Sequence, residues 1–310
     1  MYHKLKIKKF GNLEQDIDQK KLIKALQDTY KNTAFSTFPY IIKNYSSKKS
    51  IEKLNCGNCI ALSMYLKNYL TNNYNVKSYL VPATIPRKYS NYFYLDISHV
   101  ALAVPKSKNK IYIVDPAFYF LSPAQVNKST NEKYLYSKNI YEIEKNDNPR
   151  EYTSLDKVIY RKDKLTECLK LNDYQQIPKD TFFIECKYSD DHSDKWRYYL
   201  TQIENPDKSI SNFFSNIKNE PFILCTNIDK NGICESGYYV RVKDERITVK
   251  YKNEFVESIS FEDILKNKEE FKNKIKNYGI KKFFGDDIIN SIIDYVKDNE
   301  KFKNNINIED

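Results

Sequence analysis

The sequence predicts an α+β fold that begins with helices, continues with strands and ends with a mixture of both. Three observations support this. Residues 14–33 have the apolar spacing of an amphipathic helix, residues 76–114 contain short runs typical of strands, and residues 221–256 alternate strands with turns before further helical segments. The chain has 310 residues, of which 41% are hydrophobic, so it is long enough to bury a sizeable core.

The elements at the N-terminal end are two helices separated by a loop. The first helix has an apolar stripe, and a loop-like stretch follows it at 34–50. The second helix starts at Cys59 and runs to Leu70, with Gly57 and Asn58 placed to cap it. Cys59 therefore lies in the first turn of a helix.

The expected strands are short, and turn-forming residues separate them. They are Val76–Ile85, Val100–Val104, Lys110–Val114, two strands around a polar turn within 181–203, and a meander within 221–256. Two helices are expected after the meander, at about 261–277 and 285–300.

Charge and hydropathy narrow the class of protein. Lys and Arg number 51 against 41 Asp and Glu, a net charge of +10, but the basic residues are interleaved with acidic ones. That pattern favours a solvated basic surface over a nucleic-acid interface. The mean hydropathy is -0.70, and neither an apolar run of membrane-spanning length nor a signal core is present. We therefore expect a cytoplasmic protein, a monomer or weak oligomer, with no nucleic-acid or membrane partner and with reduced cysteines.

Histidine is scarce, which makes each one informative. His3 is close to the N-terminus and His192 lies in a polar turn, whereas His99 begins an apolar strand. Asp115 directly follows the next strand. Two adjacent antiparallel strands would place His99 and Asp115 side by side, and a helix N-terminus would present Cys59.

A cysteine, a histidine and an aspartate in this pattern indicate nucleophilic catalysis. A thiolate attacks carbonyl carbon, and a helix N-terminus favours the thiolate form. A neighbouring imidazole exchanges protons with the thiol and the leaving group, and an aspartate fixes its tautomer. We predict an acyl-transferring or acyl-cleaving enzyme with Cys59 as nucleophile, served by His99 and Asp115.

Cys56 and Cys59 also form a CxxC motif, which leaves two alternatives open. The pair would suit a redox couple, but the preceding residues do not have the strand pattern of thioredoxin-like proteins. It would also suit half of a zinc site, but the sequence has no second CxxC or HxxxH motif. We prefer a nucleophilic Cys59 and expect no bound metal.

The same segments resemble the arylamine N-acetyltransferase family, which has a Cys-His-Asp triad in this chain order. Its histidine and aspartate segments are similar to Ser98–Val104 and Tyr112–Phe118. The resemblance extends through Ala34–Phe38, Pro123-Ala124, Ser211-Asn212, Pro221-Phe222, Asp229–Gly232, Ile259–Leu265 and Tyr278–Ile280.

This resemblance implies both an architecture and a reaction. The architecture would be a helical region with the nucleophile at 1–85, an antiparallel, β-barrel-like region with the histidine and aspartate at 86–200, and an α/β lid with C-terminal helices at 201–310, around a cysteine-proteinase-like core. The reaction would be ping-pong transfer of an acyl group from acetyl-CoA or another acyl-CoA to a small-molecule amine. Cys59 would be the nucleophile, His99 the base and Asp115 the residue that orients it, while the residues that bind CoA stay unknown.

Departures from the family pattern keep other functions open. The family has Arg-Gly-Gly before its cysteine and a glutamate after it, whereas Asn55–Ser63 has neither the arginine nor the glutamate. Gly57-Asn58-Cys59 and Val114-Asp115-Pro116 also resemble the transglutaminase-like superfamily. The alternatives are therefore a transglutaminase-like or cysteine-protease-like enzyme acting on protein amides, and an inactive scaffold of the same fold. Three phenylalanines are candidates to line a substrate pocket: Phe35, Phe38 and Phe118.

Overall fold

A computed structural model describes most of the chain. The described residues are 14–85, 97–118, 120, 122–127, 157–161, 170–172, 175–176, 182–187, 195–209, 221–228, 234–251, 254–277 and 286–306. The chain divides into two compact units, one made of Met1–Thr29 with Ser63–Asn216 and the other of Tyr30–Leu62 with Ile217–Asp310. Both divisions in the N-terminal part fall inside helices, α1 (Gln19–Asn32) and α4 (Cys59–Tyr74).

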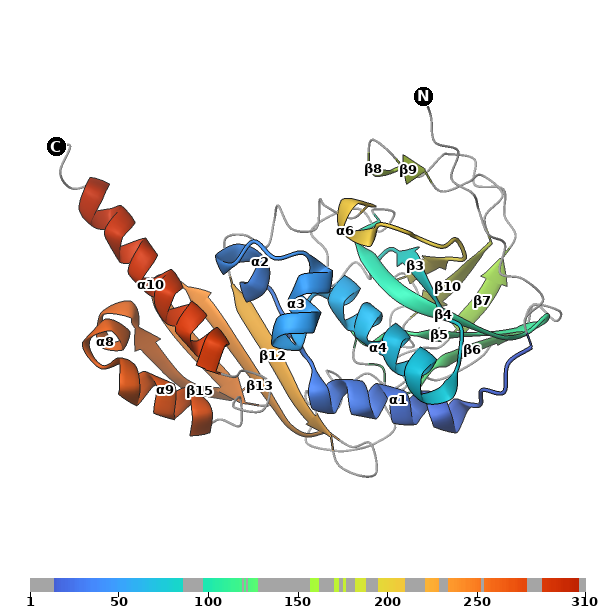
Figure 1. Ribbon diagram of the computed structural model, residues 1–310, viewed down its shortest axis with the longest axis horizontal. Coiled ribbons are helices and arrows are strands. Elements are labelled where there is room, and N and C mark those ends of the chain that lie inside the picture. The colour runs from blue at the N-terminus through green and yellow to red at the C-terminus, as the bar shows by residue number, and fades with distance from the viewer. Residues whose placement is uncertain are drawn as a thin grey trace. The chain divides into compact units, whose positions relative to one another are not determined.

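The first unit is built on a seven-stranded antiparallel sheet (Figure 1). Its order is β6 (Ala124–Asn127), β5 (Lys110–Val114), β4 (His99–Ser107), β3 (Tyr79–Ala83), β11 (Lys195–Tyr199), β10 (Phe183–Lys187) and β7 (Lys157–Arg161). The two edge strands, β6 and β7, contact each other, so the sheet curls into a nearly closed barrel. The unit also contains β8 (Lys170–Asn172), β9 (Gln175–Gln176) and the short helix α6 (Pro206–Ser209).

The core of this unit follows the two-residue period of its strands. Alternate residues of β3, β4 and β5 are buried together with large side chains from β11. The set includes Val81, Ala83, Ala101, Ala103, Ile111, Ile113, Trp196 and Tyr198. The predicted β-rich middle of the chain therefore forms a sheet. Its strand β5, Lys110–Val114, has the predicted limits.

The second unit has a six-stranded sheet. Its order is β15 (Glu254–Ser260), β14 (Arg246–Tyr251), β13 (Cys234–Lys243), β12 (Phe222–Ile228), β1 (Ala34–Ser36) and β2 (Cys56–Gly57). The first four are the predicted meander, and β1 pairs antiparallel with β12 while β2 runs parallel to β1. The helices of this unit are α2 (Phe38–Ile42), α3 (Ser47–Leu54), α8 (Phe261–Lys266), α9 (Lys268–Asn277) and α10 (Asp286–Ile306).

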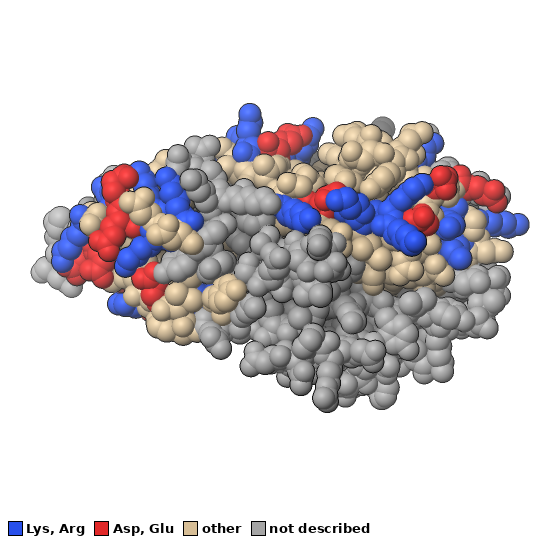
Figure 2. Space-filling view, turned by 90° about the horizontal axis from the view of Figure 1, so that it is seen from below, with Lys and Arg blue, Asp and Glu red and all other residues tan. Residues whose placement is uncertain are grey.

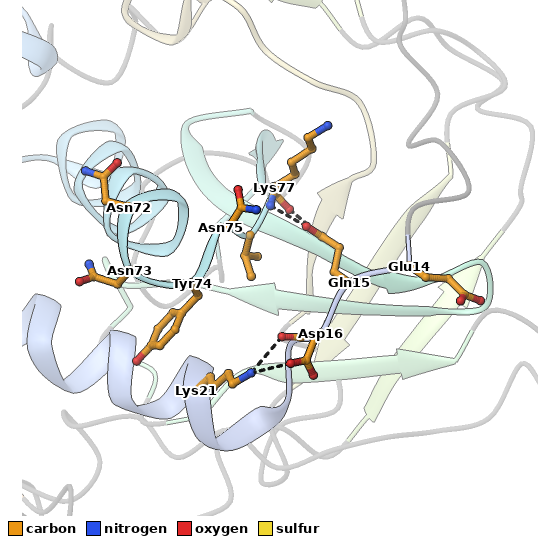
Figure 3. A pocket seen from close by; sticks show the side chains of 10 residues that line it. Glu14, Gln15, Asp16, Lys21, Asn72, Asn73, Tyr74, Asn75 and Lys77 are labelled. Atoms are coloured by element: carbon orange, nitrogen blue, oxygen red, sulfur yellow. Dashed lines mark hydrogen bonds and ion pairs between the residues drawn. The ribbon is translucent and has the colours of Figure 1, made fainter.

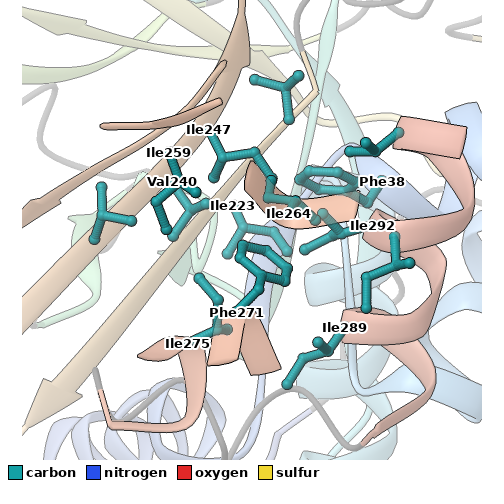
Figure 4. Close-up of a cluster of buried hydrophobic side chains, with 14 of the residues drawn as sticks. Phe38, Ile223, Val240, Ile247, Ile259, Ile264, Phe271, Ile275, Ile289 and Ile292 are labelled. Carbon is teal, nitrogen blue, oxygen red and sulfur yellow. The ribbon is translucent and has the colours of Figure 1, made fainter. Parts of the chain in front are cut away.

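A second apolar core lies between this sheet and the C-terminal helices (Figure 4). Isoleucine and valine side chains from β12, β13, β14 and β15 pack against α8, α9 and α10. Phe38 of α2 and Cys56 of β2 belong to the same cluster. The segment around Cys56 is therefore fixed by the hydrophobic core of the second unit.

The structure corrects two details of the predicted secondary structure. The stretch 34–50 is not a loop, because it forms β1 and α2 and begins α3, whose N-cap Ser46 accepts a hydrogen bond from the N–H of Lys49. The helix expected at 261–277 is two helices, interrupted at Asn267 by a non-helical conformation. The side chain of Asn267 accepts from the N–H of Glu270 and so starts the second helix.

Surface charge is mixed on the face shown in Figure 2, where basic and acidic side chains lie close to one another. Helix α1 and the segment before it include two such pairs, Lys21 with Asp16 and Lys24 with Asp28. In the part of the chain that the structure describes, no helix combines the length and apolar character required for a membrane span.

Candidate active site

The structure brings His99 and Asp115 together in the first unit. His99 is the first residue of β4, and Asp115 directly follows β5. These two strands pair antiparallel, with Leu102 opposite Val114, so the start of one lies next to the end of the other. His99 Nε2 lies 2.7 Å from Asp115 Oδ2, and both side chains are buried.

The Asp115 carboxylate has donors on both of its oxygens. Oδ1 accepts the N–H groups of Ala117 and Phe118 at 3.2 and 3.3 Å, in the turn that follows β5. Oδ2 accepts the phenol O–H of Tyr198 at 2.7 Å in addition to His99. All four contacts lie away from solvent, because Asp115 is fully buried.

The network also assigns the tautomer of His99. An ionised carboxylate only accepts hydrogen bonds, so Nε2 carries the hydrogen that points at Asp115. Nδ1 is then the nitrogen that carries the lone pair. Such an arrangement suits a base at Nδ1, with a carboxylate on the other ring nitrogen.

Tyr198, on β11, is a site residue that the sequence did not reveal. Burial first, and the nearby Asp115 charge second, raise the pKa of Tyr198 well above its ordinary value. The phenol therefore stays protonated and acts as a hydrogen-bond donor. Cys186 is affected by the same charge. Burial first, and the Asp115 charge second, raise the pKa of Cys186, so its thiol is neutral.

Phe118 lies against the imidazole. Its ring centroid is 4.5 Å from that of His99, with the planes inclined at 42°. The same centroid is 6.3 Å from that of the Trp196 ring. The other two predicted pocket residues belong to the second unit. Phe35 stacks on Phe222 at 5.7 Å, while Phe38 is buried in the apolar core. A pocket role for these three phenylalanines stays a prediction.

Cys59 belongs to the second unit and is the first residue of α4. The predicted cap at Asn58 is confirmed, because its side-chain Oδ1 accepts the N–H of Ala61 at 3.1 Å. Gly57 permits the tight approach before the helix, since a Cβ there would lie 2.5 Å from the Cβ of Ala61. The pairing of Cys59 with His99 stays a prediction.

The two cysteines of the CxxC motif have different surroundings. Both are free thiols and both are buried. Burial raises the pKa of Cys56 to about 12, although hydrogen bonds with Ser36 and Ser50 partly oppose that rise. Cys56 is therefore a neutral thiol in ordinary buffers. Among the described residues, no group of three or more His, Cys, Asp or Glu side chains has an arrangement suited to a metal ion.

A polar pocket of about 640 Å³ lies elsewhere in the first unit (Figure 3). It is formed by the segment before α1, by Lys21 of α1, and by the C-terminal end of α4 with the residues after it. Three of the polar side chains that line it have partners. Gln15 bonds to the backbone of Lys77 and Pro105, and Asp16 pairs with Lys21. None of the predicted site residues lines this pocket.

Comparison with solved structures identifies the fold. A variant of the Mycobacterium smegmatis N-arylamine acetyltransferase matches with a TM-score of 0.50 at 11% identity, over 91% of this chain and 93% of that one. Arylamine N-acetyltransferase C from Bacillus anthracis matches with a TM-score of 0.50 at 15% identity, over 86% of this chain and 93% of that one. The chain has the arylamine N-acetyltransferase fold.

Other comparisons add little to this result. The Mycobacterium marinum arylamine N-acetyltransferase, solved in complex with CoA, matches with a TM-score of 0.48 at 12% identity, over 90% of this chain and 93% of that one. No family model matches the sequence, and no curated protein matches it. At these identities the N-acetyltransferase likeness establishes the fold and not the reaction.

Proposed function

We propose that this protein is an N-acyltransferase that works through a cysteine thioester. The observation that supports it most is the buried His99–Asp115 pair, on a fold shared with arylamine N-acetyltransferases. In this proposal Cys59 is the nucleophile, His99 is the base, and Asp115 orients the imidazole and stabilises its charge.

The reaction would proceed in two half-reactions. His99 takes the thiol proton, the Cys59 sulfur attacks the acyl carbonyl of acetyl-CoA or another acyl-CoA, and the C–S bond to CoA breaks. The proton on His99 passes to the departing CoA thiolate, which leaves as free CoA. An amine then attacks the Cys59 thioester, His99 takes a proton from that amine and returns it to the sulfur, and the amide departs.

The developing oxyanion in both steps needs hydrogen-bond donors. The start of α4 has two, because the N–H groups of Cys59 and Ile60 have no acceptor in the described part of the chain. The N–H of Leu62 is used by the Asn58 carbonyl at 3.0 Å, and that of Ala61 by the Asn58 side chain. The free donors are thus the two nearest to the sulfur.

The test is intact mass after incubation with acetyl-CoA, on wild type, Cys59→Ala and Cys56→Ala. An added acetyl group on wild type and Cys56→Ala, and none on Cys59→Ala, is the expected result. Cys56→Ala is the matched control, since it removes the other thiol of the same motif. Acetylation that persists in Cys59→Ala would contradict the assignment of the nucleophile.

A second candidate is an enzyme that transfers or hydrolyses protein amides with the same three residues. The observation that favours it is the sequence Gly57-Asn58-Cys59, in which no arginine precedes the cysteine. Selective alkylation of Cys59 without any acetyl adduct would favour this candidate. If Cys59 were neither acetylated nor selectively alkylated, an inactive scaffold would be the better description.

A further inference from the structure

A buried polar cluster lies beneath the start of α4 in the second unit. Its members are Asn58, Tyr40 of α2 and Ser47, the first residue of α3. Asn58 and Ser47 are fully buried. Asn58 Oδ1 accepts the O–H of Tyr40 at 2.8 Å and the O–H of Ser47 at 3.1 Å, as well as the N–H of Ala61.

Tyr40 holds Asn58 at two points. Its phenol oxygen accepts the backbone N–H of Asn58 at 3.0 Å, while its O–H donates to the Asn58 side chain. The orientation of the amide is fixed by the same contacts, because the reverse orientation would set Nδ2 against the N–H of Ala61. The residue before Cys59 is therefore held by its backbone and by its side chain at once.

The NH₂ group of the Asn58 side chain has no partner among the described residues. Asn58 Nδ2 is buried and makes no hydrogen bond within the described residues. Leaving such a group unpaired is unfavourable. An aspartate would provide the same capping oxygen without that unpaired donor, but it would place a buried negative charge one residue from Cys59. The amide keeps the position neutral, so it adds no charge that would oppose a thiolate at Cys59.

We infer that Asn58, anchored by Tyr40 and Ser47, is a positioning residue for Cys59. It closes the first turn of α4 through Ala61 and Leu62 and leaves the N–H groups of Cys59 and Ile60 for the sulfur or an oxyanion. This inference rests on the proposed function, in which Cys59 is the nucleophile. Asn58 itself touches no reacting atom, so its effect is exerted through the helix start and through the absence of charge.

The experiment is the pH dependence of Cys59 alkylation by iodoacetamide, followed by peptide mapping on the full chain. Asn58→Ala should slow alkylation about tenfold near pH 7 and move the midpoint of the pH–rate profile upward, with rates converging at high pH. Asn58→Asp should also move the midpoint upward, through its charge, whereas Asn58→Ser should stay close to wild type because serine caps and is neutral.

Two further variants separate positioning from folding. Asn73→Ala is the matched control, since Asn73 bonds to the carbonyl of Tyr69 near the other end of α4, and it should leave the midpoint unchanged. Tyr40→Phe removes the two Tyr40 hydrogen bonds to Asn58 and keeps the cap bond from Ala61, and it should shift the midpoint in the same direction as Asn58→Ala, by less. It keeps the inference testable if Asn58→Ala does not fold.

The outcomes distinguish this inference from the proposed function. If wild-type Cys59 reacts no faster than the other cysteines, the proposed function fails first. If wild-type Cys59 is selectively reactive but Asn58→Ala and Tyr40→Phe leave the midpoint in place, the proposed function stands and the positioning role is refuted. An equal slowing of Asn58→Ala at every pH would also refute it, because that pattern reports a structural loss.

Discussion

Replacing Asp115 by asparagine is the sharpest test of the His99 network. The change keeps the size of the side chain but replaces one accepting oxygen by a donating NH₂ group. If the remaining oxygen keeps the N–H groups of Ala117 and Phe118, Nδ2 faces His99 and Tyr198. The imidazole must then accept at Nε2 and carry its hydrogen on Nδ1. In that tautomer Nδ1 has no lone pair for the thiol proton.

The size of the effect follows from the bonds that are lost. The two contacts at Oδ2, from His99 and Tyr198, are both 2.7 Å long and both involve a charged acceptor. Hydrogen bonds to charged groups contribute about 1.5–3 kcal/mol each, so the pair contributes about 3–6 kcal/mol. At about 1.36 kcal/mol per tenfold change in rate, we expect a loss of roughly 10²- to 10⁴-fold.

The assay is the burst of p-nitrophenolate released from p-nitrophenyl acetate, since this activated ester acylates a reactive thiol without CoA. Asp16→Asn is the control, because that carboxylate is exposed and pairs only with Lys21 in the described surroundings. Thermal unfolding of each variant is measured in parallel. A burst rate for Asp115→Asn within about tenfold of wild type, with an unchanged unfolding midpoint, would refute the tautomer argument.

Three further predictions use other contacts of the same structure. Tyr198→Phe removes one hydrogen bond from the Asp115 carboxylate, so it should slow the burst roughly 10- to 100-fold without changing the fold, and a wild-type rate would exclude a positioning role. Cys56→Ser should keep the burst rate, because the pKa of Cys56 is raised to about 12 and its thiol is not ionised in the assay; a lost burst in the folded variant would contradict this. Gly57→Ala should lower the free energy of unfolding in urea by about 1–3 kcal/mol, since the added Cβ would lie 2.5 Å from the Cβ of Ala61, and an unchanged midpoint would count against that crowding.

The sequence was informative where the relevant partners are close along the chain. The capping of α4 depends on Asn58 and on a residue three positions later, and both lie in one short segment. His99 and Asp115 are brought together by β4 and β5, which are consecutive strands joined by a tight turn. Short-range patterns of this kind are set by local propensity, and they can be recognised without knowledge of the tertiary fold.

The sequence was uninformative where partners are distant along the chain. Tyr198 reaches Asp115 from β11, and nothing local distinguishes it from the other tyrosines among the 27 in the chain. Strand β1 pairs with β12, which is distant from it along the chain, so the segment at 34–50 resembled a loop. Long-range pairing decides both features, and a single sequence does not record it. His3 and His192 lie outside the described residues, and the division into three regions stays a prediction.

The two halves of the proposed catalytic apparatus are each organised within their own unit. The His99 network draws its contacts from β4, from the turn after β5 and from β11, all strands or turns of one barrel. The Asn58 network draws its contacts from α2, α3 and α4 near the apolar core that contains Phe38 and Cys56. The two networks share no residue, so each can hold its geometry before a substrate binds. Preorganisation of this kind is what an acyl transfer needs, because donors and bases that are already in place do not have to reorganise as charge develops.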